Sequence, residues 1–253
     1  MIDQPQIIEL EQIASNAWVA EETERFGGWL LRANSGITRR ANSVLPLGPP
    51  PIPLDEAIEY VIDFYKTRNL IPRFQMTEAS KPVELDRDLS ERGFSVGLQV
   101  EIHTAAISHL VQKEPAFDVM ISNDVSDGWM SVYSESSGYN ESSMEVRKGL
   151  MKRTTCIKGF ALAKIDRDLA GVGFGVVDGK WLGIFNIAVH PSMRGRGVAS
   201  SMNTALAKWA HQRGAKSAYL QVESENLPAL KLYSKLGFQQ LYTYWYRKLD
   251  EEE

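Results

Sequence analysis

The stretch Asn-Ile-Ala-Val-His-Pro-Ser-Met-Arg-Gly-Arg-Gly-Val-Ala-Ser-Ser, residues 186–201, decides the fold that we predict for this chain. Its apolar beginning is typical of the end of a strand, and the periodic apolar residues after Gly197 predict a helix over 197–213. A helix start leaves backbone N–H groups unpaired and has a partial positive charge. Because glycines let a phosphate approach that backbone closely, the turn is a candidate pyrophosphate site. A turn that only connects strand and helix is the alternative.

Two nucleotide-binding motifs fit this turn poorly. A Walker loop has Lys and then Ser or Thr after its second glycine, where this chain has Val198 and Ala199. The dinucleotide fingerprint needs a third glycine, and Ser200 stands there.

The surrounding elements predict a mixed, mainly antiparallel sheet flanked by helices, an α/β fold of the α+β type. Asp178-Gly179 indicates a tight hairpin between two of the strands. The helices are expected at 124–133, 140–152, 197–213 and 227–236, and the strands at 157–165, 171–177, 181–189, 218–222 and 239–249.

The first half of the chain repeats part of this order. We expect paired strands at 28–32 and 38–45, a helix at 54–67, a strand at 73–77, a helix at 82–92 and a strand from 93 to 106. A strand, a helix and Gly-Phe recur at 73–94 and at 218–238, which favours a diverged duplication over chance similarity. The polar connector 111–117 separates a predicted N-terminal domain, 1–113, from a predicted C-terminal domain, 117–253.

Two motifs in the second half resemble those of the GCN5-related N-acetyltransferases. The coenzyme A loop of that family, Arg/Gln-x-x-Gly-x-Gly/Ala, is matched by Arg194, Gly197 and Ala199, after the strand phrase Ile-Ala-Val-His-Pro at 187–191. The second signature, Asn-x-x-Ala-x-x-Leu-Tyr-x-x-x-Gly-Phe, is matched by Asn226, Ala229, Leu232, Tyr233, Gly237 and Phe238. The resemblance covers about residues 119–249 and implies the acyl-CoA N-acyltransferase fold, in tandem if the first half is a second copy.

The resemblance implies direct transfer of an acetyl group from acetyl-coenzyme A to a primary amine of a small molecule or peptide, without a metal. It assigns the pyrophosphate to the backbone amides of Arg194, Gly195, Arg196, Gly197, Val198, Ala199 and Ser200. It assigns the pantetheine arm to the main chain of Ile187, Ala188 and Val189 and to Asn226, which is also placed to cap a helix. Tyr233 is implied as the acid that protonates the departing thiolate, and a tyrosine that only packs is the alternative.

The general base is not fixed by the resemblance. Relatives place a glutamate at the positions of Gln221 or Gly183, and neither residue here is a base. Glu223 lies two residues beyond Gln221 and so on the same side of a strand, which makes it our candidate base. His190 or a chain of waters is the alternative.

The first half has no counterpart of the glycine-rich turn. Five prolines between 46 and 53 occupy that region, beginning with Pro46. Because proline has no N–H to offer a phosphate, we expect this half to have lost coenzyme binding.

Composition restricts the partners. A net charge of −4 differs from the basic face of a general nucleic-acid binder, and no apolar run is long enough to span a membrane. The single cysteine, Cys156, and a polar start over residues 1–10 predict a cytoplasmic protein. The acceptor amine and the oligomeric state, including a homodimer, stay open. A non-catalytic acetyl-coenzyme A-binding regulatory module and a nucleotide-binding oxidoreductase are the competing functions.

Overall fold

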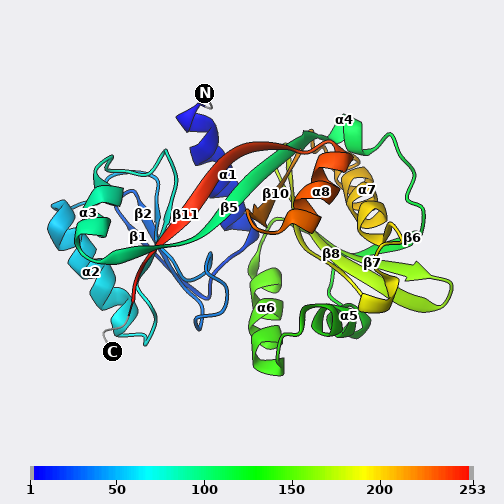
Figure 1. Cartoon of the computed structure of the whole chain (residues 1–253), viewed down its shortest axis with the longest axis horizontal. Helices are drawn as coiled ribbons and strands as arrows, with labels where there is room; N and C mark the ends of the chain where they lie inside the picture. Colours follow the sequence, from blue (N-terminus) through cyan, green and yellow to red (C-terminus); the bar gives the residue numbers. More distant parts are fainter. Residues whose placement is uncertain (1–2, 251–253) are drawn as a thin grey trace. The chain divides into compact units, whose positions relative to one another are not determined.

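A computed structural model of the chain describes residues 3–250, which form two compact units. Within the described residues, unit 1 comprises residues 3–101, Gly149–Arg153 and 242–250, and unit 2 comprises Ile102–Lys148 and Thr154–Leu241. Figure 1 labels the helices and strands of both units.

Unit 2 is built on an open sheet with the strand order β5-β10-β9-β8-β7-β6. Strands β9 and β10 are parallel, whereas β6 with β7, β7 with β8 and β8 with β9 are antiparallel. The strands are β5 (Phe94–Ala106, through its last residues), β6 (Asp118–Ser122), β7 (Ile157–Ile165), β8 (Asp168–Asp178), β9 (Trp181–Val189) and β10 (Ser217–Glu223). The helices are α4 (Ile107–Leu110), α5 (Asp127–Ser137), α6 (Glu141–Arg153, through its residues up to Lys148), the 3-10 turn η1 (Pro191–Met193), α7 (Val198–His211) and α8 (Leu227–Leu236).

Glycines on one face of β7 and β8 let helix α7 lie directly on the sheet. A Cβ added at Gly175 would be 2.8 Å from Leu206, and one added at Gly159 would be 2.8 Å from Trp209. Gly171 and Gly173 stand at alternate positions of the same strand face and are equally close to side chains above them. Helix and sheet therefore share a tight apolar core along α7.

Unit 1 repeats the same sequence of elements. Its helices are α1 (Gln4–Ala17), α2 (Leu54–Lys66) and α3 (Leu85–Glu91), and its strands are β1 (Glu22–Phe26), β2 (Trp29–Ala33), β3 (Leu45–Pro46) and β4 (Arg73–Met76), with parts of β5 and β11 (Gln239–Leu249). The strand orders are β1-β2-β3 and β4-β11-β5. Val44, just before β3, bridges Phe74 of β4 in parallel, as β9 and β10 pair around α7 in unit 2. This mixed, mainly antiparallel α+β architecture in two copies confirms the predicted fold class.

Each unit also contains a strand from the other half of the sequence. β11, at the end of the chain, pairs antiparallel with β4 of unit 1, from Trp245 opposite Met76 to Lys248 opposite Arg73. The end of β5, residues 102–106, belongs to unit 2, where β5 neighbours β10. The compact units thus exchange strands, and the division into domains 1–113 and 117–253 stays a prediction.

In the segment 38–45, which we predicted to be a strand, only Leu45 is in a strand, and residues 38–44 form a loop wrapped around the buried side chain of Asn42. The Asn42 Oδ1 accepts hydrogen bonds from the N–H groups of Asn34 (2.8 Å) and Gly36 (3.0 Å), and its Nδ2 donates to the carbonyl of Thr38 at 2.7 Å. Hydrogen bonds to this side chain take the place of the strand pairing that we expected for the segment. Strand β2 pairs instead with β1 and with the two residues of β3. Helix α1 and strand β6 lie in segments for which we had predicted no element.

Candidate active site

The parallel strands β9 and β10 separate before they end. Their register runs from Trp181 opposite Ser217 to Ile184 opposite Leu220, and β9 then continues to Val189. Within the described residues, 187–189 lie beyond the end of this register with β10. The strand edge over which we predicted the pantetheine arm, residues 187–189, is therefore not used by β10.

A β-bulge lies in the same part of β9. Val172 pairs with Ala188 and Phe174 pairs with Phe185, so Gly173 alone faces two residues of β9. One of these two, Asn186, has a positive φ of 52°. A bulge bends its strand and increases the local twist, which turns the backbone of Ile187 to Val189 away from a regular ladder.

The turn after β9, where we predicted a pyrophosphate cradle, contains two glycines in the left-handed conformation. Gly195 and Gly197 have φ values of 75° and 87°, which side-chain-bearing residues rarely adopt. Gly197 is the N-cap of α7 and offers no side chain to the N–H groups of the first turn, which have no intrahelical acceptor. A Cβ placed on Gly197 would meet no atom within 4 Å, so the space in front of these amides is open.

The arginine side chains of the turn contact protein groups. Arg194 donates to the carbonyls of Val189 and of Ser136 in α5, both at 3.4 Å, and Arg196 lies 3.2 Å from the sulfur of Met193. Both side chains thus contact other groups of the protein, and the backbone amides of the turn stay our predicted pyrophosphate-binding groups.

His190, our alternative base, also contacts protein groups next to this turn. Its Nδ1 is 2.7 Å from the Ser192 hydroxyl, and its Nε2 is 3.3 Å from a carboxylate oxygen of Glu135 in α5. The two ring nitrogens thus have protein partners, and the ring links the turn to α5.

The second motif places its residues on α8. Asn226 is exposed and caps the helix, because its Oδ1 accepts a hydrogen bond from the N–H of Ala229 at 3.2 Å. Tyr233 is half-buried against the core that also contacts Ile187 of β9, and its ring meets Phe238 edge-on at 5.8 Å. Burial raises the pKa of Tyr233 to about 12, so the phenol is protonated at neutral pH.

The structure shows the surroundings of two positions that we considered for the general base, Gly183 and Glu223. Gly183 has no space for a side chain, because an added Cβ would be 2.6 Å from the Tyr219 hydroxyl across the strand pair. Glu223 is the last residue of β10 and is exposed, on the strand whose separation from β9 opens the site. A carboxylate is therefore present at the end of β10 and excluded at Gly183.

The equivalent place in unit 1 is closed by its own backbone. The carbonyl of Pro46, the last residue of β3, accepts a hydrogen bond from the N–H of Lys81 at 2.9 Å. The Lys81 carbonyl in turn accepts from the indole of Trp29 at 2.8 Å. The segment that would have to separate from β3 is thus held against it.

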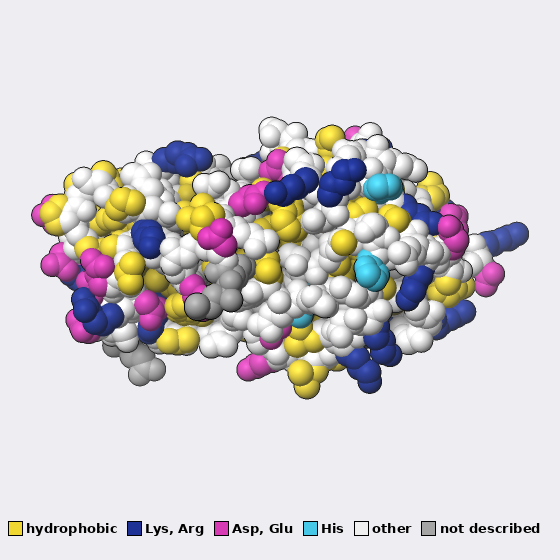
Figure 2. Space-filling view, turned by 90° about the horizontal axis from the view of Figure 1, so that it is seen from above, with side chains coloured by type: hydrophobic (Ala, Val, Ile, Leu, Met, Phe, Trp, Pro, Cys, Tyr) yellow, Lys and Arg dark blue, Asp and Glu magenta, His cyan; other side chains and the backbone are white. Residues whose placement is uncertain are grey.

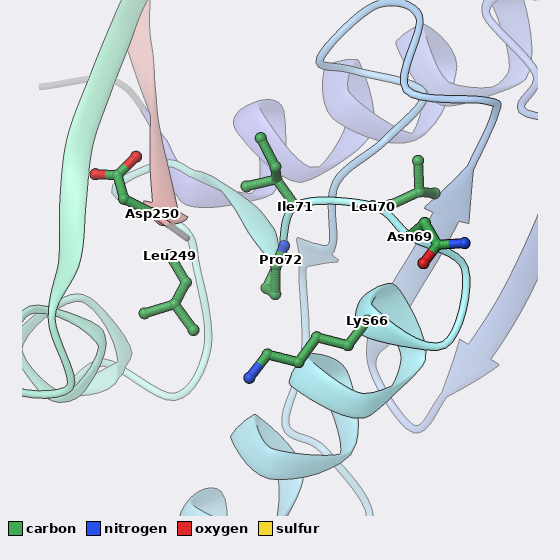
Figure 3. A pocket seen from close by; sticks show the side chains of 7 residues that line it. All are labelled: Lys66, Asn69, Leu70, Ile71, Pro72, Leu249 and Asp250. Carbon is green, nitrogen blue, oxygen red and sulfur yellow. The ribbon is translucent and has the colours of Figure 1, made fainter. Parts of the chain in front are cut away.

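Unit 1 has a cavity of about 420 Å³, shown in Figure 3, which lies outside every site that we predicted. It is lined by Lys66, Asn69, Leu70, Ile71, Pro72, Leu249 and Asp250. The Lys66 side chain extends along one side, and the Asp250 carboxylate accepts a hydrogen bond from the Ser95 hydroxyl at 2.8 Å. Its lining combines polar and apolar side chains.

On the face of the molecule in Figure 2, basic side chains occur between acidic and apolar ones. In the part of the chain that the structure describes, no three His, Cys, Asp or Glu residues are grouped to hold a metal ion. No helix among residues 3–250 is long and apolar enough to cross a membrane.

Comparisons with known proteins agree with this geometry. The model of the family described as "Probable histone acetyltransferase Rv0428c C-terminal" matches residues 5–247. The chain is 30% identical over 245 residues to YobR of Bacillus subtilis (strain 168), described as an uncharacterized N-acetyltransferase, and the match covers 95% of this chain and 98% of YobR.

Two solved structures share the fold. A GCN5-related N-acetyltransferase from Kribbella flavida has a TM-score of 0.72 at 14% identity, covering 100% of this chain and 97% of its own. A tandem GNAT protein from the clavulanic acid biosynthesis pathway has a TM-score of 0.64 at 13% identity, covering 96% of this chain and 89% of its own. With the family match over residues 5–247, these likenesses show that the chain belongs to this histone acetyltransferase-like family, within the GCN5-related N-acetyltransferase superfamily.

Proposed function

We propose that unit 2 transfers an acetyl group from acetyl-coenzyme A directly to a primary amine of a small molecule or peptide. The observation that supports this most is the opening of β9 from β10 beyond Ile184 and Leu220, which leads to the glycine-started helix α7. An extended amide-containing arm fits an unpaired strand edge, and a pyrophosphate fits a helix start.

In this proposal the chain holds acetyl-coenzyme A mainly by its backbone. The amides of the turn and first helical turn, 194–200, face the pyrophosphate, where the helix dipole favours negative charge. The main chain of 187–189 pairs with the pantetheine arm, and an N–H of this segment polarises the thioester carbonyl. Asn226, whose Oδ1 caps helix α8, contacts the arm with its amide hydrogens.

Transfer forms a nitrogen–carbon bond and breaks the carbon–sulfur bond of the thioester. The attacking amine must lose a proton, and we assign its acceptance to Glu223, with His190 or a chain of waters as alternatives. Tyr233 gives its phenolic proton to the departing sulfur, a role that suits a pKa of about 12 because the group is then protonated at neutral pH. No acyl-enzyme is needed.

The single cysteine has no part in this chemistry. Burial is the main cause that raises the pKa of the Cys156 thiol, so the thiolate nucleophile is disfavoured. A cytoplasmic location, absence of nucleic-acid and membrane partners, and the oligomeric state remain predictions of the same proposal.

Two measurements on the full chain test the proposal. Calorimetry with acetyl-coenzyme A, NAD and ATP should show binding of the first alone, and binding of NAD instead would favour the oxidoreductase. Free-thiol release should then be followed over a panel of amines and peptides with acetyl-coenzyme A. Binding without release by any acceptor would favour the non-catalytic regulatory module.

A further inference from the structure

Helix α7 contains a fully buried amide whose oxygen has no hydrogen-bond donor. Asn203 is 0% exposed, and its Nδ2 donates to the carbonyl of Ala199 one turn earlier at 2.8 Å. Its Oδ1 is buried and has no partner among the residues that the structure describes. Most buried polar atoms in proteins are paired, so this acceptor indicates a donor that the protein itself does not supply.

The orientation of this amide is set by its neighbour. The carbonyl of Ala199 can only accept, so the Asn203 NH₂ must face it and the oxygen must point elsewhere. The next residues on the same side of the helix, Ala207 and Ala210, belong to the apolar core and have no side-chain donor. If no ligand bound at this position, a buried apolar side chain would be more stable there than an amide whose oxygen has no donor.

The printed contacts of α7 indicate which way Asn203 faces. Val198 and Met202 lie over Gly171 of β8, so the first turns of the helix rest on that strand. Ser201 accepts a hydrogen bond from the N–H of Ala116, which precedes β6 at the far edge of the sheet. At about 100° per residue, Asn203 is about 160° around the helix from Ser201. Its flank therefore faces the other way, toward the β9 side of the sheet.

We propose that the Oδ1 of Asn203 accepts a hydrogen bond from an amide N–H of the pantetheine arm of the bound coenzyme. This inference rests on the proposed function and adds a side chain to a site that otherwise consists of backbone groups. An oxygen acceptor repels phosphate oxygens, which have no proton to share, whereas the pantetheine arm has amide donors. Asn203 should thus select for the arm and have no role in holding the nucleotide.

The test compares two ligands on two variants of the full chain. Asn203→Leu removes the acceptor at similar volume, and Asn203→Ala removes it with a good helix former in case the first variant packs poorly. Calorimetry should show that both variants bind acetyl-coenzyme A about tenfold more weakly than wild type, the loss of one hydrogen bond. Adenosine 3′,5′-bisphosphate, which lacks the arm, should bind all three proteins equally.

Ser201→Ala is the matched control on the opposite flank of the same turn. It removes a buried side-chain hydrogen bond, so it should lower the melting temperature and leave both affinities unchanged. Equal affinity of wild type and the Asn203 variants for acetyl-coenzyme A would overturn the inference, as would a matching loss for the bisphosphate. A wild-type chain that binds neither ligand would instead overturn the proposed function, and this inference with it.

Discussion

Ile184 and Leu220 are the last residues that pair across the parallel strands β9 and β10. Up to this pair β9 is paired with both β10 and β8, and after it β9 continues beside β8 through a bulge to the glycine turn. A parallel ladder hydrogen-bonds the facing edges of both strands, so ending it releases backbone donors and acceptors on β9. The predictions below test whether a coenzyme uses them.

Gly197→Ala should weaken the binding of acetyl-coenzyme A at least tenfold. The added methyl group would occupy the open space before the helix amides, and a residue with a Cβ resists the φ of 87° found here. Calorimetry on the purified variant measures the loss.

Gly214→Ala is the matched control, because Gly214 has a φ of 91° just beyond the other end of α7 and an equally open Cβ position. Both substitutions should destabilise the chain by roughly 1–2 kcal/mol, the cost of a left-handed residue with a Cβ. Only the first should alter affinity. Equal affinities for wild type and Gly197→Ala would show that the turn is not the cradle.

Tyr233→Phe should lower kcat by roughly 10²-fold with little change in affinity for acetyl-coenzyme A. The variant keeps the ring contact with Phe238 and loses only the hydroxyl proton. The expected loss is at the low end for acid catalysis because a thiolate leaves readily, with a thiol pKa near 8.5. Steady-state kinetics with an identified acceptor measure it, and a wild-type kcat would show that Tyr233 only packs.

The pH dependence of Tyr233 follows from its raised pKa. With a pKa of about 12, the phenol keeps its proton throughout the range in which an ordinary tyrosine, near 10, would lose it. The wild-type pH–rate profile should therefore have no alkaline decline caused by Tyr233 below about pH 11. A decline centred near 10 that disappears in Tyr233→Phe would contradict this assignment.

The buried carboxylate of Glu11 should make unit 1 less stable as the pH rises. Its oxygens accept hydrogen bonds from Gln75 at 2.7 Å and Tyr242 at 2.8 Å, yet burial dominates and raises its pKa. A raised pKa means that the folded state binds the proton more tightly, so this contribution is present below the unfolded pKa of 4.5 and lost as the pH rises through the folded value. From pH 4 to 7, Glu11→Gln should gain stability relative to wild type in urea unfolding.

Glu22→Gln provides a control of opposite sign. The exposed Glu22 carboxylate is paired with Arg68, whose hydrogen bond lowers its pKa. Its contribution is present above the unfolded pKa of 4.5 and lost as the pH falls through the folded value, so this variant should lose stability relative to wild type over the same range. Parallel behaviour of the two variants would refute the assignment for Glu11.

The exchange of strands predicts that neither half of the chain folds alone. Unit 1 needs β11, where Arg247 binds Asp86 through two hydrogen bonds, Nε to Oδ1 at 2.9 Å and Nη2 to Oδ2 at 2.7 Å. Fragments 1–113 and 117–253 should each lack a cooperative unfolding transition and regain one when they are refolded together. Circular dichroism melts of the separate and combined fragments measure this, and an independent transition in fragment 1–113 would contradict it.

Local patterns in the sequence were sufficient for most of unit 2. The predicted bounds of β9, α8 and β11 agree with the structure. Apolar residues recur within each of these elements, and a glycine or asparagine close to its end marks where it begins or stops. The glycine turn at 195–197 and the second motif on α8 were likewise visible as short phrases. The comparisons support the family that these phrases indicated.

The roles of side chains whose contacts are far away in the sequence could not be predicted from local patterns. Glu11 and Asn42 are polar, yet both are buried, Glu11 against Gln75 and Asn42 inside a loop. In the sequence, a buried polar residue is indistinguishable from an exposed one, so α1 was missed and 38–45 was predicted to be a strand. The orphan oxygen of Asn203 became evident only when the contacts of α7 were known.

The sequence by itself determined the family, the repeated order of elements and the glycine-started helix, because each depends on residues close together in the chain. Only the tertiary structure decided where β9 leaves β10, that no side chain fits at Gly183, and that β5 and β11 each contribute to both units. These features depend on pairing between segments far apart in sequence. Strand pairing is satisfied by backbone groups that every residue has, so the sequence does not mark which strands become neighbours.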